Sequence, residues 1–484
     1  MQKIRAILAY ALAGVAIFLA ARGIGWYASR SPSVQLQRQV IAKVEELDGF
    51  TYYDFQIIDP GTDKERIADR EDPDLKRHWL SGITGVEWFH DLHYVTFAQF
   101  DGVPEDGGQA TARTEITDQE VLPLLKLGTI RWWALSGTAI SDKTVIEIAS
   151  QSEPERLWLG QTKITDKSLQ SLAKSKSLNY LAIESTPTTD IGLQALADSD
   201  SIESLSLGSP YYTASGLKNL GELTSLQELY ADRLPVAGAM EGIGGLPNLR
   251  VLSLRGTGIG DQELAKISQV KSLEVLHVDS TLIGDQGLAA AQSWRSLKEI
   301  TMSSTLVSDI GLGMLSDCNG LTKLRLADTK CTLPGVLKLL EQTQQKSLVE
   351  ALEVVFETKK SESGALLSLN LSPIEMRDED VDLLRPLQDL QWLVMPRSSF
   401  TNSAMETIAG LGLPKLQLLN VDNSNIDDEG LQTLCELKSI RNIHIVNTNV
   451  SPEGVLAAKA KRSSLQVYRS VVRRGASAAP EPNP

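Results

Sequence analysis

The most regular feature of the chain is a pattern of apolar positions that recurs every 23 or 24 residues. In each unit the first, fourth and sixth positions are apolar, as in the unit with Leu249, Leu252 and Leu254, where Ile259 closes the following turn. This alternation predicts a short strand with one buried face, followed by a turn and a short helical segment. Seven such strands are predicted in sequence, beginning at Leu178, Ile202, Leu226, Leu249, Leu273, Leu297 and Leu321. Because one unit cannot bury its apolar face alone, neighbouring units must stack.

The units resemble the leucine-rich-repeat pattern LxxLxLxxN/CxL. Representative examples are LRVLSLRGTGIGDQEL, LEVLHVDSTLIGDQGL and LKEITMSSTLVSDIGL. Threonine stands where asparagine or cysteine is usual, at Thr257, Thr281 and Thr305. The resemblance implies an α/β leucine-rich-repeat solenoid with a curved parallel sheet inside, short helices outside and roughly 14 to 16 coils.

The array extends in both directions from this centre. Further units are predicted to begin at Ile130, Pro154, Leu390, Leu416, Ile440 and Leu465, so the array is assigned to residues 116–469. Its register is irregular over 327–389, where the polar stretch 358–364 predicts an exposed loop. Residues 470–484, rich in alanine and proline, predict a disordered tail.

Residues 31–115 predict an N-terminal cap and a first irregular coil. Apolar residues recur at helical spacing from Val34 to Leu47, and the strand-like segment DGFTYYDFQIIDP follows. A helix and a strand placed here would cover the otherwise exposed first coil.

Residues 1–30 predict a membrane anchor. A helix over residues 6–28 would be long enough to cross ~30 Å of hydrocarbon. Lys3 and Arg5 predict that the N-terminus is cytoplasmic, which would place the bulk of a single-pass bacterial inner-membrane protein in the periplasm. The alternative is a signal peptide, and cleavage of residues 1–21 would give a periplasmic or secreted protein.

A second resemblance concerns the cap together with the repeats. The segments AKVEELDGFTYYDFQIIDP and HWLSGITGVEWFHDLHYVTF, followed by TxITDxGL-type repeats, are similar to membrane-associated leucine-rich-repeat proteins of planctomycete-type bacteria. The likeness covers roughly residues 35–470. This chain differs by having Asp48-Gly49 where two glycines are common, and by an inserted loop over 101–113. The resemblance implies a structural or interaction role and supplies no ligand or site residues.

Aspartates recur just before the helical segment of many units. Such a carboxylate can cap the backbone N–H groups of the first turn and complement the helix dipole. We therefore predict helix N-caps at Asp142, Asp166, Asp190, Asp261, Asp285 and Asp309.

Composition and motifs argue against several classes of function. The net charge of −14 and pI near 5.0 exclude a general nucleic-acid surface. Cys318, Cys331 and Cys435 are too widely spaced to suggest a disulfide framework or a zinc site, and His90 and His93 lack an evident third ligand. The glycines of GTGIGD at 256–261 do not follow GxGxxG. We therefore expect no catalytic residues, no metal and no cofactor.

The remaining candidate site is the concave sheet face. Aromatic and arginine side chains are enriched in binding hot spots. The proposed partner surface comprises Arg131, Trp132, Arg156, Trp158, Tyr180, Glu184, Tyr230 and Arg233. Alternatively, the tryptophans could pack under the 101–113 insertion or against the cap. A weaker second surface comprises Trp392, Arg397, Asn420, Asp422 and His444.

These observations predict a membrane-anchored, non-enzymatic recognition or scaffolding protein that binds a protein partner on its concave face. The alternative is a cell-envelope carbohydrate-binding or structural module, for which the aromatic side chains would stack on an envelope polysaccharide.

Overall fold

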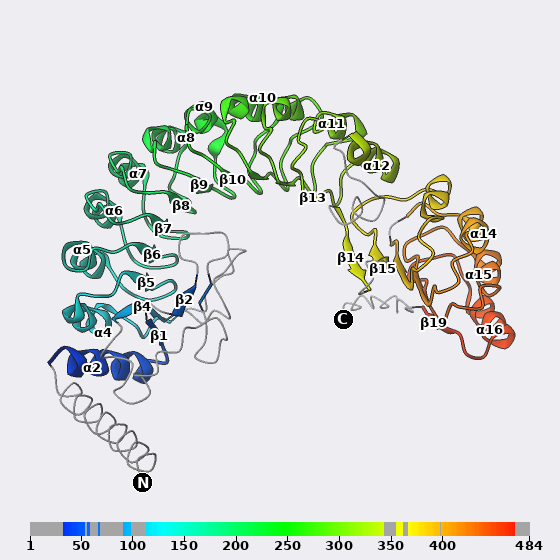
Figure 1. The fold of residues 1–484 in the computed structure, drawn as a ribbon, viewed down its shortest axis with the longest axis horizontal. Coiled ribbons are helices and arrows are strands. Elements are labelled where there is room, and N and C mark those ends of the chain that lie inside the picture. The colour runs from blue at the N-terminus through cyan, green and yellow to red at the C-terminus, as the bar shows by residue number, and fades with distance from the viewer. Residues whose placement is uncertain are drawn as a thin grey trace, which may run out of the picture. The chain divides into compact units, whose positions relative to one another are not determined.

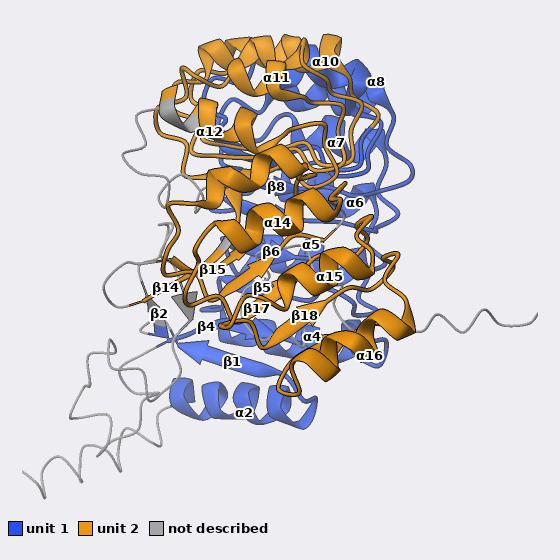
Figure 2. Ribbon diagram, turned by 90° about the vertical axis from the view of Figure 1, so that its right-hand side faces the viewer, with its two compact units in different colours: residues 1–257 blue, residues 258–484 orange. Residues whose placement is uncertain are grey.

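The structure is a computed structural model that divides into two compact units, Met1–Thr257 and Gly258–Pro484 (Figure 2). It describes residues 32–53, 56–58, 66–67, 91–97, 113–342, 355–361, 366–396 and 398–469. The predicted anchor over residues 6–28 and the predicted tail over 470–484 lie outside these ranges. Among the residues within them, no helix is both long and apolar enough to cross a membrane.

Unit 1 begins with a helix and an antiparallel strand pair, followed by parallel coils. Strand β1 (Phe50–Tyr53) runs antiparallel to β4 (Leu92–Thr96), and successive strands from β4 to β10 pair in parallel. The cap predicted over 31–115 thus contains a helix, α2, and a strand, β1, in that order. The helices are α2 (Pro32–Glu46), α4 (Asp118–Val121), α5 (Asp142–Gln151), α6 (Asp166–Leu172), α7 (Asp190–Leu196), α8 (Ala214–Lys218) and α9 (Met240–Ile243), with the 3-10 turns η3 (Leu122–Leu127), η4 (Asn219–Glu222) and η5 (Val236–Ala239). The other strands are β2 (Ile57–Ile58), β3 (Arg66–Ile67), β5 (Trp132–Ala134), β6 (Arg156–Trp158), β7 (Tyr180–Ala182), β8 (Ser204–Ser206), β9 (Glu228–Tyr230) and β10 (Val251–Ser253).

Unit 2 contains two parallel runs of coils. The first run holds β11 (Val275–His277), β12 (Glu299–Thr301) and β13 (Lys323–Arg325). The second begins with β14 (Glu357–Lys360), antiparallel to β15 (Leu366–Asn370), and continues in parallel through β16 (Trp392–Val394), β17 (Leu418–Asn420), β18 (Asn442–His444) and β19 (Gln466–Tyr468). The helices are α10 (Asp261–Ala265), η6 (Lys266–Gln269), η7 (Gly287–Ser293), α11 (Asp309–Gly313), α12 (Leu333–Gln342), η8 (Asp378–Leu384), α14 (Asn402–Gly410), α15 (Asp428–Leu434) and α16 (Pro452–Lys461).

In each unit the strands line one side of the coils and the helices line the other (Figure 1). The apolar pattern explains this arrangement, because Leu249, Leu252, Leu254 and Ile259 have no exposed surface and fill the space between the two layers. The seven central strands each begin two residues after their predicted starts. The strand, turn and helix order of a leucine-rich-repeat solenoid is therefore confirmed in both units.

The recurring aspartates do not act as N-caps, so that prediction is wrong. The cap is the preceding residue: the hydroxyl of Ser141 accepts the N–H of Lys143 at the start of α5, and that of Thr165 accepts the N–H of Lys167 at the start of α6. Asp142 is the first residue of α5, and its carboxylate accepts the backbone N–H and the hydroxyl of Thr165 at 2.7 and 2.6 Å. The aspartate thus joins its own coil to the cap of the next one.

This bridge recurs along both units. The same acceptor pattern is made by Asp118 to Ser141, Asp166 to Thr189, Asp190 to Thr213, Asp285 to Ser308, Asp309 to Thr332, Asp378 to Thr401 and Asp428 to Ser451. Asp261 accepts only the backbone N–H of Gly284 there, because glycine has no hydroxyl. A serine or threonine side chain is short enough to cap its own helix, which leaves the aspartate free to reach the neighbouring coil. We call this set of contacts the aspartate ladder.

The irregular segment also differs from its prediction. Thr358, Lys359 and Lys360, expected in an exposed loop, belong to β14 and pair with Leu369, Ser368 and Leu366 of β15. Lys359 and Lys360 are exposed. A strand at the end of a sheet can carry such polar side chains, which is why the polarity of this stretch was misleading.

Candidate functional site

The sheet face of unit 1 that lies opposite the helices, here called the inner face, presents two rows of side chains. Parallel pairing places Tyr94, Trp132, Arg156, Tyr180, Ser204 and Glu228 in the first row, and Thr96, Ala134, Trp158, Ala182, Ser206 and Tyr230 in the second. The intervening residues, such as Leu157 and Leu181, point the opposite way and are fully buried. Five of the eight predicted site residues therefore share one face: Trp132, Arg156, Trp158, Tyr180 and Tyr230.

Aromatic rings form a continuous cluster across β1 and β4 to β7. Ring centroids are 5.3 Å apart for Tyr52 and Tyr94, 5.9 Å for Tyr94 and Trp132, 6.3 Å for Trp132 and Trp158, and 4.8 Å for Trp158 and Tyr180. These distances are typical of attractive aromatic pairs. Only 3 % of Trp132 and 8 % of Trp158 is exposed. The two tryptophans are therefore core side chains of this cluster, whereas Tyr180 at its end keeps some exposure.

The arginines beside this cluster are engaged within the protein. The guanidinium carbon of Arg156 lies 4.3 Å from the ring centroid of Trp132, which is cation–π geometry. Arg131 precedes β5, outside both rows, and its Nη1 donates to the backbone oxygen of Ser152 at 2.6 Å. Both positive charges are thus held over β5 and the turn that follows α5.

Glu184 occupies a recess formed by glycines in the coils on either side. A Cβ at Gly160 would lie 3.0 Å from Oε2 of Glu184, and a Cβ at Gly208 would lie 3.2 Å from the Cβ of Glu184. Burial raises the pKa of this carboxyl; a hydrogen bond from Ser206 opposes the rise and the nearby charge of Asp232 adds to it. The pKa of Tyr180 is also raised, by burial first and then by Glu184.

The last two predicted residues lie on and beyond β9. Tyr230 is half-buried in the second row. Arg233 is exposed in the turn after the strand, at a positive φ of 60°, and its backbone N–H donates to the carbonyl of Arg255 at 2.7 Å. Arg233 is therefore not part of either row.

Sequence reasoning missed three inner-face residues, Tyr52, Tyr94 and Glu228. Tyr94 and Trp132 are register partners, yet 38 residues separate them, so the repeat period did not align their strands. Glu228 had a usable signal, because it stands one period after Ser204 and two after Tyr180.

The weaker second surface is only partly assembled. Trp392 is 47 % exposed on β16, and Lys359 Nζ lies 5.8 Å from its ring centroid. Asn420 donates to Asp422 at 2.9 Å, and the ring of His444 stacks on Tyr468 at 4.5 Å. Arg397 lies outside the described residues. This surface is a set of small separate contacts without a shared aromatic cluster.

Other features of the described residues do not suggest chemistry. No group of three or more His, Cys, Asp or Glu among them is arranged to hold a metal ion. His93 lies 3.7 Å from Glu155 and packs edge-on against Trp132, while His90 is outside the described ranges.

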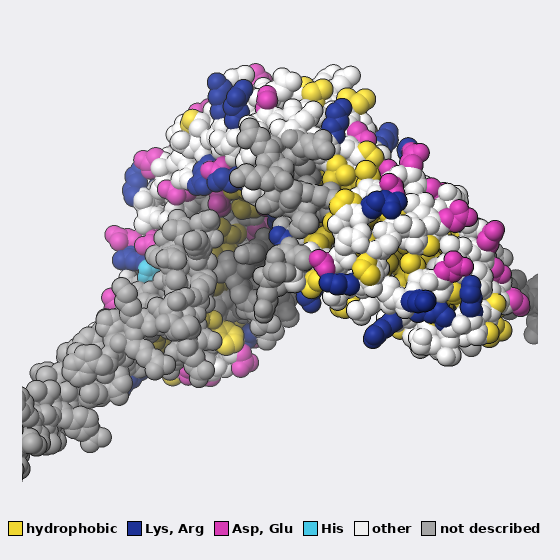
Figure 3. All heavy atoms as spheres, turned by 45° about the vertical axis from the view of Figure 1, so that its right-hand side comes forward, with side chains coloured by type: hydrophobic (Ala, Val, Ile, Leu, Met, Phe, Trp, Pro, Cys, Tyr) yellow, Lys and Arg dark blue, Asp and Glu magenta, His cyan; other side chains and the backbone are white. Residues whose placement is uncertain are grey.

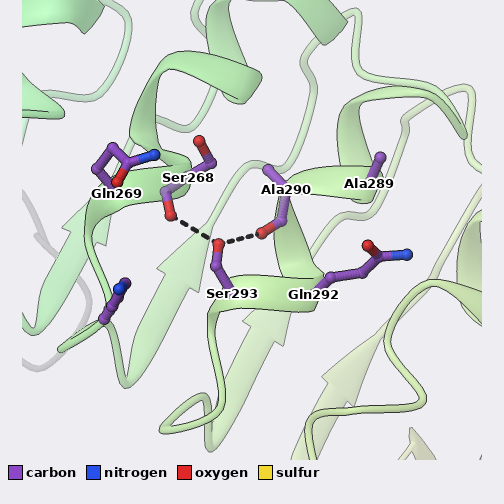
Figure 4. A pocket seen from close by; sticks show the side chains of 7 residues that line it. Ser268, Gln269, Ala289, Ala290, Gln292 and Ser293 are labelled. Atoms are coloured by element: carbon purple, nitrogen blue, oxygen red, sulfur yellow. Dashed lines mark hydrogen bonds between the residues drawn. The ribbon is translucent and has the colours of Figure 1, made fainter.

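A shallow hollow between η6 and η7 is lined by small and polar residues, and Ser293 donates there to the backbone oxygens of Ser268 and Ala290 (Figure 4). In the view of Figure 3, acidic and basic side chains are interspersed over the described surface.

The fold and its repeat register define a leucine-rich-repeat solenoid. Residues 202–471, more than half of the chain, match the family described as "Leucine-rich repeat region", and the protein belongs to that family. No curated protein matches the chain significantly.

Several solved structures match the chain. An internalin from Listeria monocytogenes is 18 % identical, with a TM-score of 0.39, and the match covers 73 % of this chain and 83 % of that one. A leucine-rich-repeat protein of Leptospira interrogans is 15 % identical, with a TM-score of 0.35 and coverage of 72 % and 80 %. The ectodomain of the Arabidopsis thaliana receptor kinase GASSHO1/SCHENGEN3 is 15 % identical, with a TM-score of 0.39 and coverage of 79 % and 50 %.

Proposed function

We propose that the protein is a membrane-anchored, non-enzymatic recognition or scaffolding protein that binds a protein partner through the inner face of unit 1. The observation that carries this proposal is the strand register that puts three side chains on one face: Arg156 and Tyr180 in the first row, on β6 and β7, and Tyr230 in the second row, on β9. Their backbones are fixed by the parallel ladder, so their side chains are presented from a rigid surface. Half-buried tyrosines lose little conformational entropy on binding and supply large contact areas.

The dimensions of the face suit a protein better than a small molecule. Six strands from β4 to β9, at ~4.8 Å per strand, give a surface roughly 25 Å across. A standard protein interface uses about 800 Å² on each partner, so a protein partner would also contact the turns that follow these strands. Side chains rather than an enclosed pocket would then determine selectivity.

The membrane part of the proposal rests on the sequence of residues 6–28. That run would hold the chain in a bacterial inner membrane, and Lys3 and Arg5 would keep its N-terminus cytoplasmic. The inner face would then meet its partner in the periplasm. Membrane fractionation with N-terminal sequencing tests this: a soluble protein that begins near Ala21 would overturn the anchor.

The partner surface is tested by crosslinking the full-length protein in its native membrane and identifying what is captured. The informative variant is Tyr180→Ser combined with Tyr230→Ser. Tyr211→Ser is the matched control, because Tyr211 is 59 % exposed and stands outside the two rows. We expect one protein to be captured by the wild type and the control and lost from the double variant.

Two results would contradict this proposal. Equal capture by the double variant would exclude the inner face as the contact surface. Recovery of envelope polysaccharide without a protein would favour the carbohydrate-binding alternative, in which the same tyrosines stack on sugar rings.

A further inference from the structure

One turn in unit 2 contains a residue pair that occurs nowhere else in the chain, Asn319 followed directly by Gly320. The turn connects α11 to β13 in the first run of coils (Figure 1). The backbone N–H of Leu321 donates to the carbonyl oxygen of Cys318 at 3.1 Å, so Asn319 and Gly320 are the two central residues of a β-turn. Both central residues are exposed to solvent.

The equivalent turn in unit 1, Leu223–Leu226, is held to the preceding coil by a serine. Ser225 Oγ donates there to the backbone oxygen of Ile202, which lies 23 residues earlier, at 2.8 Å. Gly320 occupies the position of that serine, and a Cβ built on it would lie 3.6 Å from the backbone oxygen of Leu297, again 23 residues earlier. Because glycine has no hydroxyl, the turn that contains Gly320 lacks this bond between coils.

The backbone nitrogen of Gly320 is also free to react. Nothing among the described residues accepts its N–H. A glycine has no side chain to obstruct an approach to the preceding residue, and its backbone rotates more widely than that of other residues. An exposed asparagine, a flexible neighbour and an unbonded backbone N–H therefore coincide in this turn.

We propose that Asn319 is a site of spontaneous deamidation, the reaction that makes asparagine a thermolabile residue. The backbone nitrogen of Gly320 attacks Cγ of Asn319 and forms a bond to it. The bond between Cγ and Nδ2 breaks, and ammonia leaves with the proton from the Gly320 N–H. Water then opens the succinimide ring. Hydrolysis at Cγ gives aspartate, and hydrolysis at the backbone carbonyl carbon gives isoaspartate, in which the chain runs through the former side chain.

Both products change the coil that holds β13. Each adds a negative charge close to the exposed Asp317. Isoaspartate also adds an atom to the backbone between Cys318 and Leu321, the two residues whose hydrogen bond closes the turn. Leu321 is 1 % exposed and begins the core of its coil, and the N–H of Thr322 donates to the backbone oxygen of Lys298 at 2.7 Å. The modification should therefore loosen the attachment of β13 to β12, whether or not the inner face of unit 1 binds a partner.

The test incubates the full-length protein in detergent, either folded or in urea, in heavy-oxygen water at mildly alkaline pH. Mass spectrometry then follows the peptide that contains Asn319, and the heavy oxygen marks only the deamidation that occurs during incubation. Asn425 is the internal control, because it is also exposed but precedes the buried, β-branched Ile426, which hinders the attack. The test variant is Gly320→Ser, which supplies the serine of the equivalent turn at a position without a positive φ.

We expect Asn319 to convert in the folded protein to both aspartate and isoaspartate, faster at higher pH because the attacking nitrogen must lose its proton. Asn425 should stay intact. Gly320→Ser should slow the conversion severalfold, and more strongly in the folded protein than in urea, because only the folded turn can bond to Leu297.

Three results would overturn the proposal. Conversion of Asn319 in urea but not in the folded protein would show that the native turn prevents ring closure. Equal rates for Asn319 and Asn425 would remove the special role of this turn. Formation of aspartate without isoaspartate would exclude the succinimide. These results come from the wild-type protein, so they decide the question even if Gly320→Ser fails to fold.

Discussion

The carboxylate of Asp190 occupies the space that a side chain at Gly216 would need. A Cβ built on Gly216 would lie 1.9 Å from Oδ1 of Asp190, in the preceding coil. The same relation joins Asp309 to Gly335 and Asp428 to Gly454, each at 2.0 Å. The glycine three residues after the cap serine or threonine is therefore explained by close approach of a neighbouring carboxylate, since none of these glycines has a positive φ.

Gly216→Ala should destabilise the protein by about 1–3 kcal/mol, because the methyl group would displace Asp190 from its hydrogen bonds with Thr213. Gly313→Ala is the control: its Cβ would meet nothing within 4 Å, and the helical alanine should be neutral or stabilising by up to ~1 kcal/mol. Urea unfolding monitored by circular dichroism measures both. Combining Asp190→Ala with Gly216→Ala should cost less than the sum of the single changes.

Asp142→Ala should remove ~1–3 kcal/mol of stability near neutral pH, because Thr165 and Ser168 lose a charged acceptor. Burial raises the pKa of Asp142, but hydrogen bonds from Ser168 and Thr165 outweigh burial and the net pKa is lowered. The contribution of Asp142 to stability is therefore present above the pKa that its carboxyl has in the unfolded chain, and it is lost as the pH falls. Urea curves for wild type and variant should converge in acid; the exposed Asp198→Ala control should show little difference at any pH. A pH-independent deficit for Asp142→Ala would contradict this account.

Glu299→Gln should destabilise unit 2 by about 1–3 kcal/mol near pH 6. A hydrogen bond with His277, at 3.2 Å, lowers the pKa of Glu299; burial opposes it, and Lys323 at 2.8 Å lowers it further, to about 2. The pKa of Glu299 in the folded protein is lower than its ordinary value of 4.5. Its stabilising effect is therefore complete above about pH 4.5 and disappears toward pH 2. Chemical unfolding at several acidic pH values should show the gap between the two proteins closing, and a gap that widens in acid would refute the assignment.

The native protein should react slowly with a thiol reagent at pH 8. Cys318, Cys331 and Cys435 are all buried, and burial raises the pKa of Cys318 to about 11 and of Cys331 to about 12. Both the low thiolate fraction and the lack of access oppose reaction. Denaturant should release three reactive thiols per chain. Rapid labelling of a native thiol would show that its coil opens readily.

The repeat register was predictable because one period governs both the core and the strand. Leu252 and Leu254 had to face inward. Because strand side chains alternate, that requirement alone puts the side chains of the two residues that flank Leu252 on β10 on the opposite face of the sheet. The same reasoning placed Arg156 and Tyr180 on one face.

Contacts between coils were harder to infer from a single period. Asp142 was read within its own helix, but its carboxylate is used 23 residues later, at Thr165. The polarity of Lys359 and Lys360 suggested a loop, although their strand pairs with residues that follow it. Tyr94 and Trp132 are 38 residues apart in the sequence, so the repeat period could not align them. In each case the missing information was a partner in another coil.

The aspartate ladder also bears on how such an array could change its length in evolution. Many coils offer a carboxylate on one side and a cap hydroxyl, in several cases with a glycine, on the other, as Asp285 does to Ser308 and Gly311, and Asp309 does to Thr332 and Gly335. Excision of the 24 residues from 286 to 309 would bring Asp285 to the cap and glycine that Asp309 now meets. Junctions that carry these groups resemble one another, so the coils between them are interchangeable at these joints. Gene rearrangements that add or remove one complete period would leave the bonding between neighbours intact, whereas those that add or remove a fraction of a period would not.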